Sequence, residues 1–281
     1  MSGRKKGPPP KKFECIFCGG PGPTAEHIWS DWMRDYFQRT PHSVHEATID
    51  NEREVGDQRP RQREDLHGSM INKKVRAVCG RCNSGWMSGV ETEAIRPLKR
   101  LMFGERHVIS PPEQLALVHW VLLKLFVSEF NKPVSPSFTA ATRRAFMQTR
   151  AIPANLFIGA MAYDGGEPPG HGKWCAALSR QAIWIGDEDQ SPEILANDAM
   201  QRNTVSATFG VGFAAFHIYH SYALAVTPGS NPIFARDLWP CAGVSLNWPP
   251  HQIMTTDELD EGAAAFDRYL AAKKGRPLPI L

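Results

Sequence analysis

The sequence feature that most constrains this chain is a pair of Cys-x-x-Cys motifs. Cys15-x-x-Cys18 and Cys79-x-x-Cys82 are separated by 60 residues. A Cys-x-x-Cys turn brings two thiolates close enough to share one ion, and two such turns supply the four sulfur ligands of a tetrahedral structural zinc. We therefore predict that one Zn²⁺ ion binds all four cysteines and closes the long excursion between the pairs. The alternative is a disulfide pair or an incidental set of buried thiols.

The domain organisation follows from composition and from a change of pattern near residue 108. Hydrophobic residues make up 42% of the 281 positions, which is enough for one large or two modest domains. Pro111-Pro112 then opens a strongly apolar segment, which indicates the start of a new unit. We predict a disordered basic tail, a zinc module and an α+β accessory domain with an antiparallel sheet, over residues 1–12, 13–107 and 108–281.

The same patterns bear on localisation. The most apolar segment, Leu115 to Phe130, is interrupted by His119, Lys124 and Glu129 and is shorter than the roughly 20 residues that span a bilayer. We predict no transmembrane helix, and no secretory signal, because no apolar stretch follows the basic N-terminus. A cytoplasmic, reducing environment suits zinc thiolates and the free, buried thiols that we expect at two further positions, Cys175 and Cys241.

Periodicity predicts the main secondary structure. Apolar positions indicate a short helix within 28–37, a long loop or weak hairpin over 40–65, and a strand over 74–78. A helix after Asn83 is expected to break or kink near Pro97. The accessory domain is predicted to contain a helix from Pro112 to about Phe130, four strands and a final helix; the last five are expected over 156–163, 174–184, 204–213, 214–226 and 257–274.

Three polar residues near the cysteines suggest hydrolytic chemistry. Glu26-His27 lies between the two pairs, and Asn83 directly follows Cys82. Histidine titrates near neutral pH, so His27 can deprotonate water. The Glu26 carboxylate and the Asn83 side-chain carbonyl are hard oxygen donors suited to Mg²⁺ or Mn²⁺. Cutting a phosphodiester needs such a base, together with a charge that stabilises the phosphate and the leaving alkoxide.

The order Cys-x-x-Cys, Glu-His-Ile, Cys-x-x-Cys-Asn resembles the HNH, or ββα-metal, endonuclease family in its zinc-stapled subgroup. The resemblance covers about residues 13–103. It implies a ββα-metal module in which His27 is the general base and Glu26 and Asn83 bind a catalytic Mg²⁺ or Mn²⁺ ion. It also implies structural zinc at Cys15, Cys18, Cys79 and Cys82, and hydrolysis of phosphodiester bonds in DNA, with double-stranded DNA as the expected partner.

Charge and the C-terminal half leave further roles open. Residues 1–107 contain 19 Lys or Arg against 14 Asp or Glu, an excess that suits phosphate binding or an ordinary solvated surface. Besides the endonuclease, we consider a non-catalytic zinc-stapled nucleic-acid-binding protein and a structural or regulatory protein that needs zinc only for folding. The accessory domain could form a homo-oligomer or bind a partner protein. His217 and His220 would lie on opposite faces of a strand, so we expect core and surface roles for them.

Overall fold

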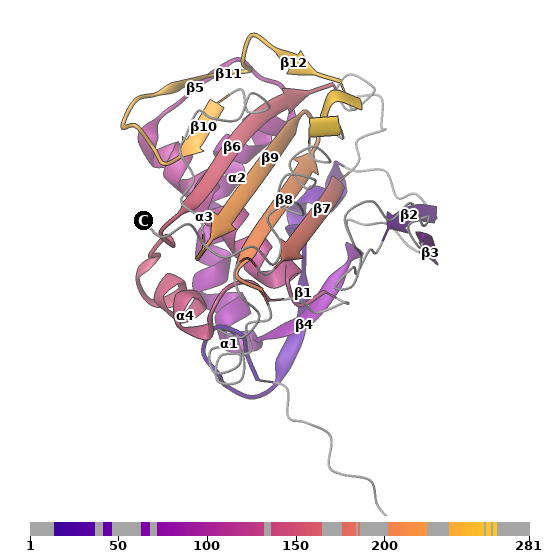
Figure 1. The fold of residues 1–281 in the computed structure, drawn as a ribbon, viewed down its shortest axis with the longest axis vertical. Coiled ribbons are helices and arrows are strands. Elements are labelled where there is room, and N and C mark those ends of the chain that lie inside the picture. Colours follow the sequence, from indigo (N-terminus) through magenta and orange to yellow (C-terminus); the bar gives the residue numbers. More distant parts are fainter. Residues whose placement is uncertain are drawn as a thin grey trace, which may run out of the picture.

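The protein has a mixed α+β fold with antiparallel sheets, in agreement with the predicted class (Figure 1). The computed structural model describes residues 14–36, 42–46, 63–67, 72–131, 136–164, 176–183, 185, 202–223, 236–255, 257–259 and 261–262. The predicted N-terminal tail, Cys175 and most of the predicted C-terminal helix lie outside the described residues.

The largest sheet has six strands and occupies the C-terminal half of the chain (Figure 1). Its order is β10-β6-β9-β8-β7 with antiparallel neighbours, and β12 pairs parallel with β6. The strands are β6 (Leu156–Tyr163), β7 (Ala176–Ile183), β8 (Thr204–Val211), β9 (Ala214–Ser221), β10 (Arg236–Trp239) and β12 (Ile253–Met254). β7 pairs antiparallel with β8, and β8 forms an antiparallel hairpin with β9.

Both faces of the central strands are covered. Every residue of β6, β8 and β9 is buried, including the Thr, Ser and His residues of β8 and β9. One face packs against α3 (Pro111–Ser128). A smaller buried cluster contains residues of β6, β9 and β12 together with Leu259. Its members are Met161, Tyr163, Ala215, Met254 and Leu259.

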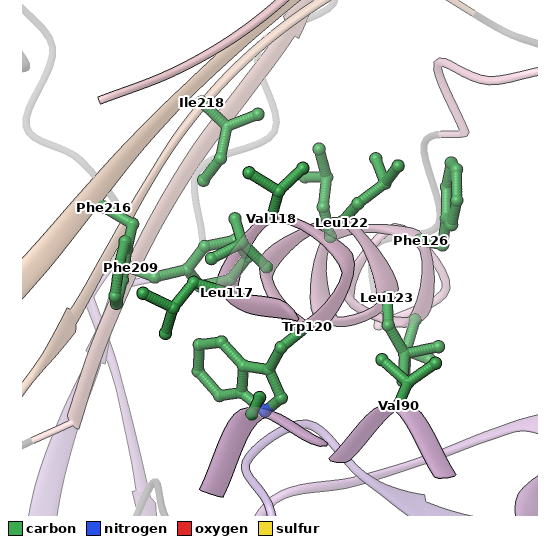
Figure 2. Packing of buried hydrophobic residues seen from close by; sticks show 14 of the residues in the cluster. Val90, Leu117, Val118, Trp120, Leu122, Leu123, Phe126, Phe209, Phe216 and Ile218 are labelled. Carbon is green, nitrogen blue, oxygen red and sulfur yellow. The ribbon is translucent and has the colours of Figure 1, made fainter. Parts of the chain in front are cut away.

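Helix α3 forms the centre of the molecule. Its N-terminus has the predicted proline start and a capping box in which the Ser110 amide donates to Glu113 Oε2 at 2.9 Å. Figure 2 shows Leu117 on the side of Phe209 and Phe216, and Val118 pointing toward Ile218, all three of them residues of the sheet. On the other side, Leu123 lies next to Val90 of α2 (Ser88–Met102), so that the helix is buried from both directions.

The N-terminal elements pack against both α3 and the sheet. Helix α2 packs along α3, and the rings of Trp29 and of Phe209 in β8 have centroids 5.9 Å apart. Two antiparallel strands, β1 (Pro23–His27) and β4 (Lys74–Cys79), are followed by a continuous helical segment. That segment consists of α1 (Gly80–Cys82), a π-helical turn η3 (Asn83–Met87) and α2. Buried residues before and after position 108 belong to one hydrophobic cluster. The domain boundary near residue 108 stays a prediction.

The remaining elements are short. A one-turn 3₁₀ helix η1 (Asp31–Asp35) follows β1, and β2 (His42–Glu46) pairs with β3 (Arg63–His67) as the hairpin alternative predicted for this region. Helix α4 (Ala140–Thr149) precedes β6, and β5 (His107–Ile109) pairs with β11 (Leu246–Trp248). None of the helices in the described residues is long and apolar enough to cross a membrane, as the sequence predicts.

One local prediction holds and another does not. The short helix expected within 28–37 is the 3₁₀ helix η1, which begins after Ser30 because that residue is extended, with φ −61° and ψ 136°. The expected break at Pro97 does not occur, and α2 continues through that residue to Met102. The departure from helical geometry lies at Gly85, where ψ is −114°. A glycine tolerates that backbone conformation at little steric cost, which is why the bend falls there.

Candidate metal centre and active site

The first Cys-x-x-Cys motif forms a tight turn that is closed by backbone hydrogen bonds. The Cys15 amide donates to the Gly20 carbonyl at 2.8 Å, and the Gly19 amide donates to the Cys15 carbonyl at 2.9 Å. Gly19 has a φ of 71°, the left-handed region that favours glycine. The Gly20 amide donates to Cys18 Sγ at 3.3 Å, so the turn orients a backbone dipole toward the sulfur.

The second motif lies at a strand-to-helix junction. Strand β4 ends at Cys79, and the helix that begins at Gly80 contains Cys82 in its first turn. The turn that contains Cys15 and Cys18 is bonded to β4 as well, because the Ile16 amide donates to the Ala77 carbonyl at 2.9 Å. The two motifs, distant in sequence, are thereby placed side by side.

The four cysteines form a cluster with the dimensions of a zinc site. The sulfur atoms of Cys15, Cys18, Cys79 and Cys82 all lie within 4.8 Å of one another, and 3.6 Å separates those of Cys18 and Cys79. Thiolates at about 2.3 Å from a tetrahedral zinc are about 3.8 Å apart. All four are free cysteines. The predicted cysteine cluster is confirmed, and it can hold a structural Zn²⁺ ion.

The electrostatics of the cluster also fit a bound dication. Burial raises the pKa of Cys18 and of Cys82, and hydrogen bonding among the thiols adds to both shifts. Burial acts in the same direction on Cys79, but a hydrogen bond from the Cys82 amide and the neighbouring thiols outweigh it and lower the pKa of Cys79 to about 7. Thiolates this close oppose one another's ionisation, so a dication is needed for all four to ionise together.

Glu26 and His27 occupy the end of β1, opposite the start of β4. In the strand register, His27 pairs with Lys74. Successive residues of a strand point to opposite sides. Glu26 is 6% exposed and points to the interior. His27 is partly exposed, and its cross-strand partner Lys74 and the nearby Arg76 are exposed. The histidine therefore lies on the side of the ribbon that carries positive charge.

Asn83 and Glu26 are brought together. Asn83 begins η3 directly after the zinc-cluster residue Cys82, and its side chain lies within hydrogen-bonding reach of the Glu26 carboxylate. Burial raises the pKa of Glu26, and this effect exceeds the lowering by Lys124, whose Nζ lies 3.6 Å from Glu26 Oε1, and by Asn83. A carboxylate desolvated in this way gains more than a solvated one from a divalent counter-ion.

His27 has the electrostatics of a neutral base. Burial lowers the pKa of His27, and the positive charges of Lys74, Arg34 and Lys124 lower it further. The imidazole is therefore neutral at pH 7 and able to accept a proton. Its Nε2 atom is buried and has no hydrogen-bond partner among the described residues, and Asp31 Oδ1 lies 3.6 Å away.

The donor set at Glu26 and Asn83 is compatible with a hard divalent ion. Mg²⁺ typically takes one or two carboxylates from a protein and keeps several waters. One carboxylate and one amide oxygen within reach of each other meet that description. Glu26 and Asn83 are thus brought together, whereas His27 follows Glu26 at the end of the β1–β4 ribbon away from Cys79.

Sequence reasoning missed two charged residues at this site, Glu91 of α2 and Lys124 of α3. Lys124 is fully buried and forms ion pairs with both Glu26 and Glu91. The pairing itself has no sequence signature, because the partners lie on three different elements. The one available signal was the lysine's position in the most apolar helix of the chain, where a charge requires a buried partner.

The other residues considered in the sequence, His217, His220 and Cys241, lie outside this site. His217 is hydrogen-bonded to Thr208 Oγ1 at 2.9 Å, and burial lowers the pKa of His217 to about 3. His220 stacks against Phe138 with ring centroids 4.4 Å apart, and burial likewise lowers its pKa to about 3. Both histidines are buried, so the surface role expected for one of them is not observed. Cys241 is free, as predicted, but only partly buried.

Comparisons with protein-family models, curated proteins and solved structures find no match to this chain.

Proposed function

We propose that this protein is a zinc-stapled HNH-type endonuclease that hydrolyses phosphodiester bonds of double-stranded DNA. In this proposal His27 is the general base, and Glu26 and Asn83 hold one Mg²⁺ or Mn²⁺ ion. The observation that supports it best is the approach of the Asn83 side chain to the Glu26 carboxylate, next to a neutral histidine.

The local topology also supports the proposal. Two antiparallel strands followed by a helix are the layout that the family resemblance implies. The cysteine cluster links the turn before β1 to the junction between β4 and the helix, so an ion bound there would hold these two segments together. Asn83 is held in register with Glu26 by that junction, since it follows Cys82 directly.

The residues of the site can share the chemistry as follows. His27 Nε2 accepts a proton from a water molecule, whose oxygen forms the new bond to phosphorus. The bond from phosphorus to the leaving oxygen breaks, and that oxygen takes a proton from solvent. When bound, the divalent ion supplies positive charge to the phosphate and the leaving alkoxide. Lys74, exposed and opposite His27, is placed to contact a neighbouring phosphate.

The proposal is tested by incubating the full-length zinc-loaded protein with supercoiled plasmid. We expect nicked and linear products with Mg²⁺ or Mn²⁺, and an intact plasmid when the zinc-loaded protein is assayed with neither ion added. Linear duplex, single-stranded DNA and RNA are assayed in parallel. If every substrate stays intact with either ion, the chain is not a nuclease and the proposal is wrong.

A non-catalytic nucleic-acid-binding protein is the second candidate. It is favoured by the exposed Lys74 and Arg76 on β4, because phosphate binding by these cations requires neither a base nor a divalent ion. Both candidates predict DNA binding, so the plasmid assay separates them. A structural or regulatory protein would show neither binding nor cleavage.

Replacing Lys74 and Arg76 together by alanine is expected to weaken duplex binding and to reduce its salt dependence. Each phosphate contact contributes about one to the slope of log affinity against log salt, so the slope should fall by about 2. Fluorescence anisotropy of a labelled duplex between 50 and 200 mM salt, roughly the range over which phosphate contacts are lost, measures it. Arg144→Ala on α4, which removes another exposed cation, is the matched control. An unchanged slope in the double variant would place the DNA elsewhere.

A further inference from the structure

Lys124 is a charged residue in the interior of the protein. It lies in the last part of α3, a helix that is otherwise almost wholly apolar and buried, and its side chain is 0% exposed. An ammonium group removed from water is strongly unfavourable unless acceptors surround it. The position of these acceptors therefore shows what the lysine is held against.

All three acceptors of Lys124 belong to the elements of the candidate site. Its Nζ lies 3.6 Å from Glu26 Oε1 and 3.3 Å from the His27 carbonyl oxygen, and it also pairs closely with Glu91 Oε1. An ammonium group has three donors, so this set can satisfy it completely. Two of the three acceptors come from the Glu26-His27 dipeptide itself.

A second set of hydrogen bonds fixes the partner of the lysine. The Ser30 hydroxyl donates to Glu91 Oε1 at 2.8 Å, and Trp120 Nε1 donates to the Ser30 hydroxyl at 3.0 Å. Trp120 lies one helical turn before Lys124 on α3. The hydrogen bonds therefore form a closed circuit from α3 through the segment after β1 and through α2, and back to α3.

We propose that Lys124 and Glu91 are positioning residues that hold the Glu26 carboxylate and the His27 backbone in the geometry required for divalent-ion binding. This inference rests on the proposed function, because it concerns the ion held by Glu26 and Asn83. Groups that orient the ligands of a metal typically change its affinity by about 10- to 100-fold when they are removed. Lys124 comes from beyond residue 108, so the site needs the helix of the accessory region.

Burial alone does not account for this arrangement. Burial would raise the pKa of Glu91, but the charge of Lys124 and the hydrogen bonds from Lys124 and Ser30 outweigh it, so the pKa of Glu91 is lowered. Glu91 is thus ionised beside the lysine and serves as its counter-ion. The additional contacts of the ammonium with Glu26 and with the His27 carbonyl are those that a positioning role requires.

The test compares Lys124→Met with the double variant Lys124→Met/Glu91→Gln in the full chain. The double variant removes both buried charges and keeps an acceptor for Ser30, so it protects against a failure to fold. Zinc content and thermal unfolding report the fold. Mn²⁺ binding, followed by electron paramagnetic resonance on zinc-loaded protein, reports the site without any need for cleavage.

We expect both variants to bind Mn²⁺ about 10- to 100-fold more weakly. The Mn²⁺ concentration for half-maximal cleavage should rise correspondingly, with the KM for plasmid unchanged, a split that a general loss of stability would not produce. A folded double variant with wild-type or tighter Mn²⁺ binding overturns the positioning role, since the ammonium would then be neutral or repulsive toward the ion. A wild-type chain that neither binds Mn²⁺ nor cuts DNA overturns the proposed function and this role together.

Discussion

Replacing His27 by alanine is expected to lower the rate of DNA cleavage by about 10²- to 10⁴-fold, the usual contribution of a general base. The physical reason is the state of the imidazole: burial and the nearby Lys74, Arg34 and Lys124 lower the pKa of His27, so that it is neutral and can accept a proton at pH 7. Alanine offers no acceptor in its place. Initial rates of plasmid nicking with Mn²⁺ in excess measure the loss.

The variant should leave the rest of the site in place. His27 pairs with Lys74 through backbone groups of the ribbon, and its carbonyl, which Lys124 contacts, is kept by alanine. Zinc content, the unfolding temperature and Mn²⁺ affinity are therefore expected to match the wild type. His251→Ala, at an exposed position, is the matched control. Added imidazole should restore part of the activity to His27→Ala if a proton acceptor is what the variant lacks.

Cleavage by His27→Ala at more than about a tenth of the wild-type rate would contradict the assignment of the base. If His27→Ala cuts DNA above that threshold and still requires the divalent ion, another group activates the water. Asp31 would then be the first residue to examine, because its Oδ1 lies 3.6 Å from His27 Nε2.

The cysteine cluster was predictable because its signal is local and chemical. Each Cys-x-x-Cys pair fixes two sulfurs in one turn, and a shared ion is the usual reason for two such pairs in one chain. What the sequence did not reveal was how the second pair is presented. Cys82 and Asn83 lie within a helical segment that starts at Gly80.

The long strands and helices were also predictable, since each has a strong pattern of its own. The apolar run of β6 and the proline start of α3 are examples. Strands of two to four residues, such as β5 and β12, were missed. Segments that short contain too few residues for a period to be recognised, and their pairing is decided by tertiary contacts.

The ion pairs behind the site depend on how α3 docks. Lys124 was noticed in the sequence only as an interruption of an apolar segment, and Glu91 was not noticed at all. Their pairing requires α2 and α3 to pack with one register, and neither helix specifies the other's position. Sequence reasoning can state that such a buried charge needs a partner. It cannot name that partner before the fold is known.

Replacing Cys79 by serine is expected to release the zinc and to unfold the N-terminal elements. Apparent binding free energies of structural zinc are roughly 10–16 kcal/mol in small zinc domains, and the ion binds only the folded arrangement. Cys79 is the residue at which strand β4 ends and the helix begins, and its sulfur lies 3.6 Å from that of Cys18. A serine hydroxyl at this position is a poor ligand, so three thiolates would remain.

Zinc per chain, measured by elemental mass spectrometry, should fall from one to well below one in Cys79→Ser, and the unfolding temperature should fall with it. Cys241→Ser is the matched control, because Cys241 is also a free cysteine but lies outside the cluster, where its sulfur donates to Gln114 Oε1 at 3.2 Å. This control should keep one zinc ion. A wild-type protein purified without zinc, or a Cys79→Ser variant that retains it, would contradict the scaffold.

The same variant also connects the scaffold to the site. Asn83 reaches Glu26 only because the junction holding Cys79 and Cys82 directs it there. Loss of zinc should therefore abolish Mn²⁺ binding at Glu26 as well, whereas loss of His27 should not. In the proposed enzyme, variants of Cys79 and of His27 both fail to cut DNA, but only the Cys79 variant should lose both metals. The reason is that the cysteine cluster holds the segment that contains Asn83, whereas the proposed role of His27 is to accept a proton.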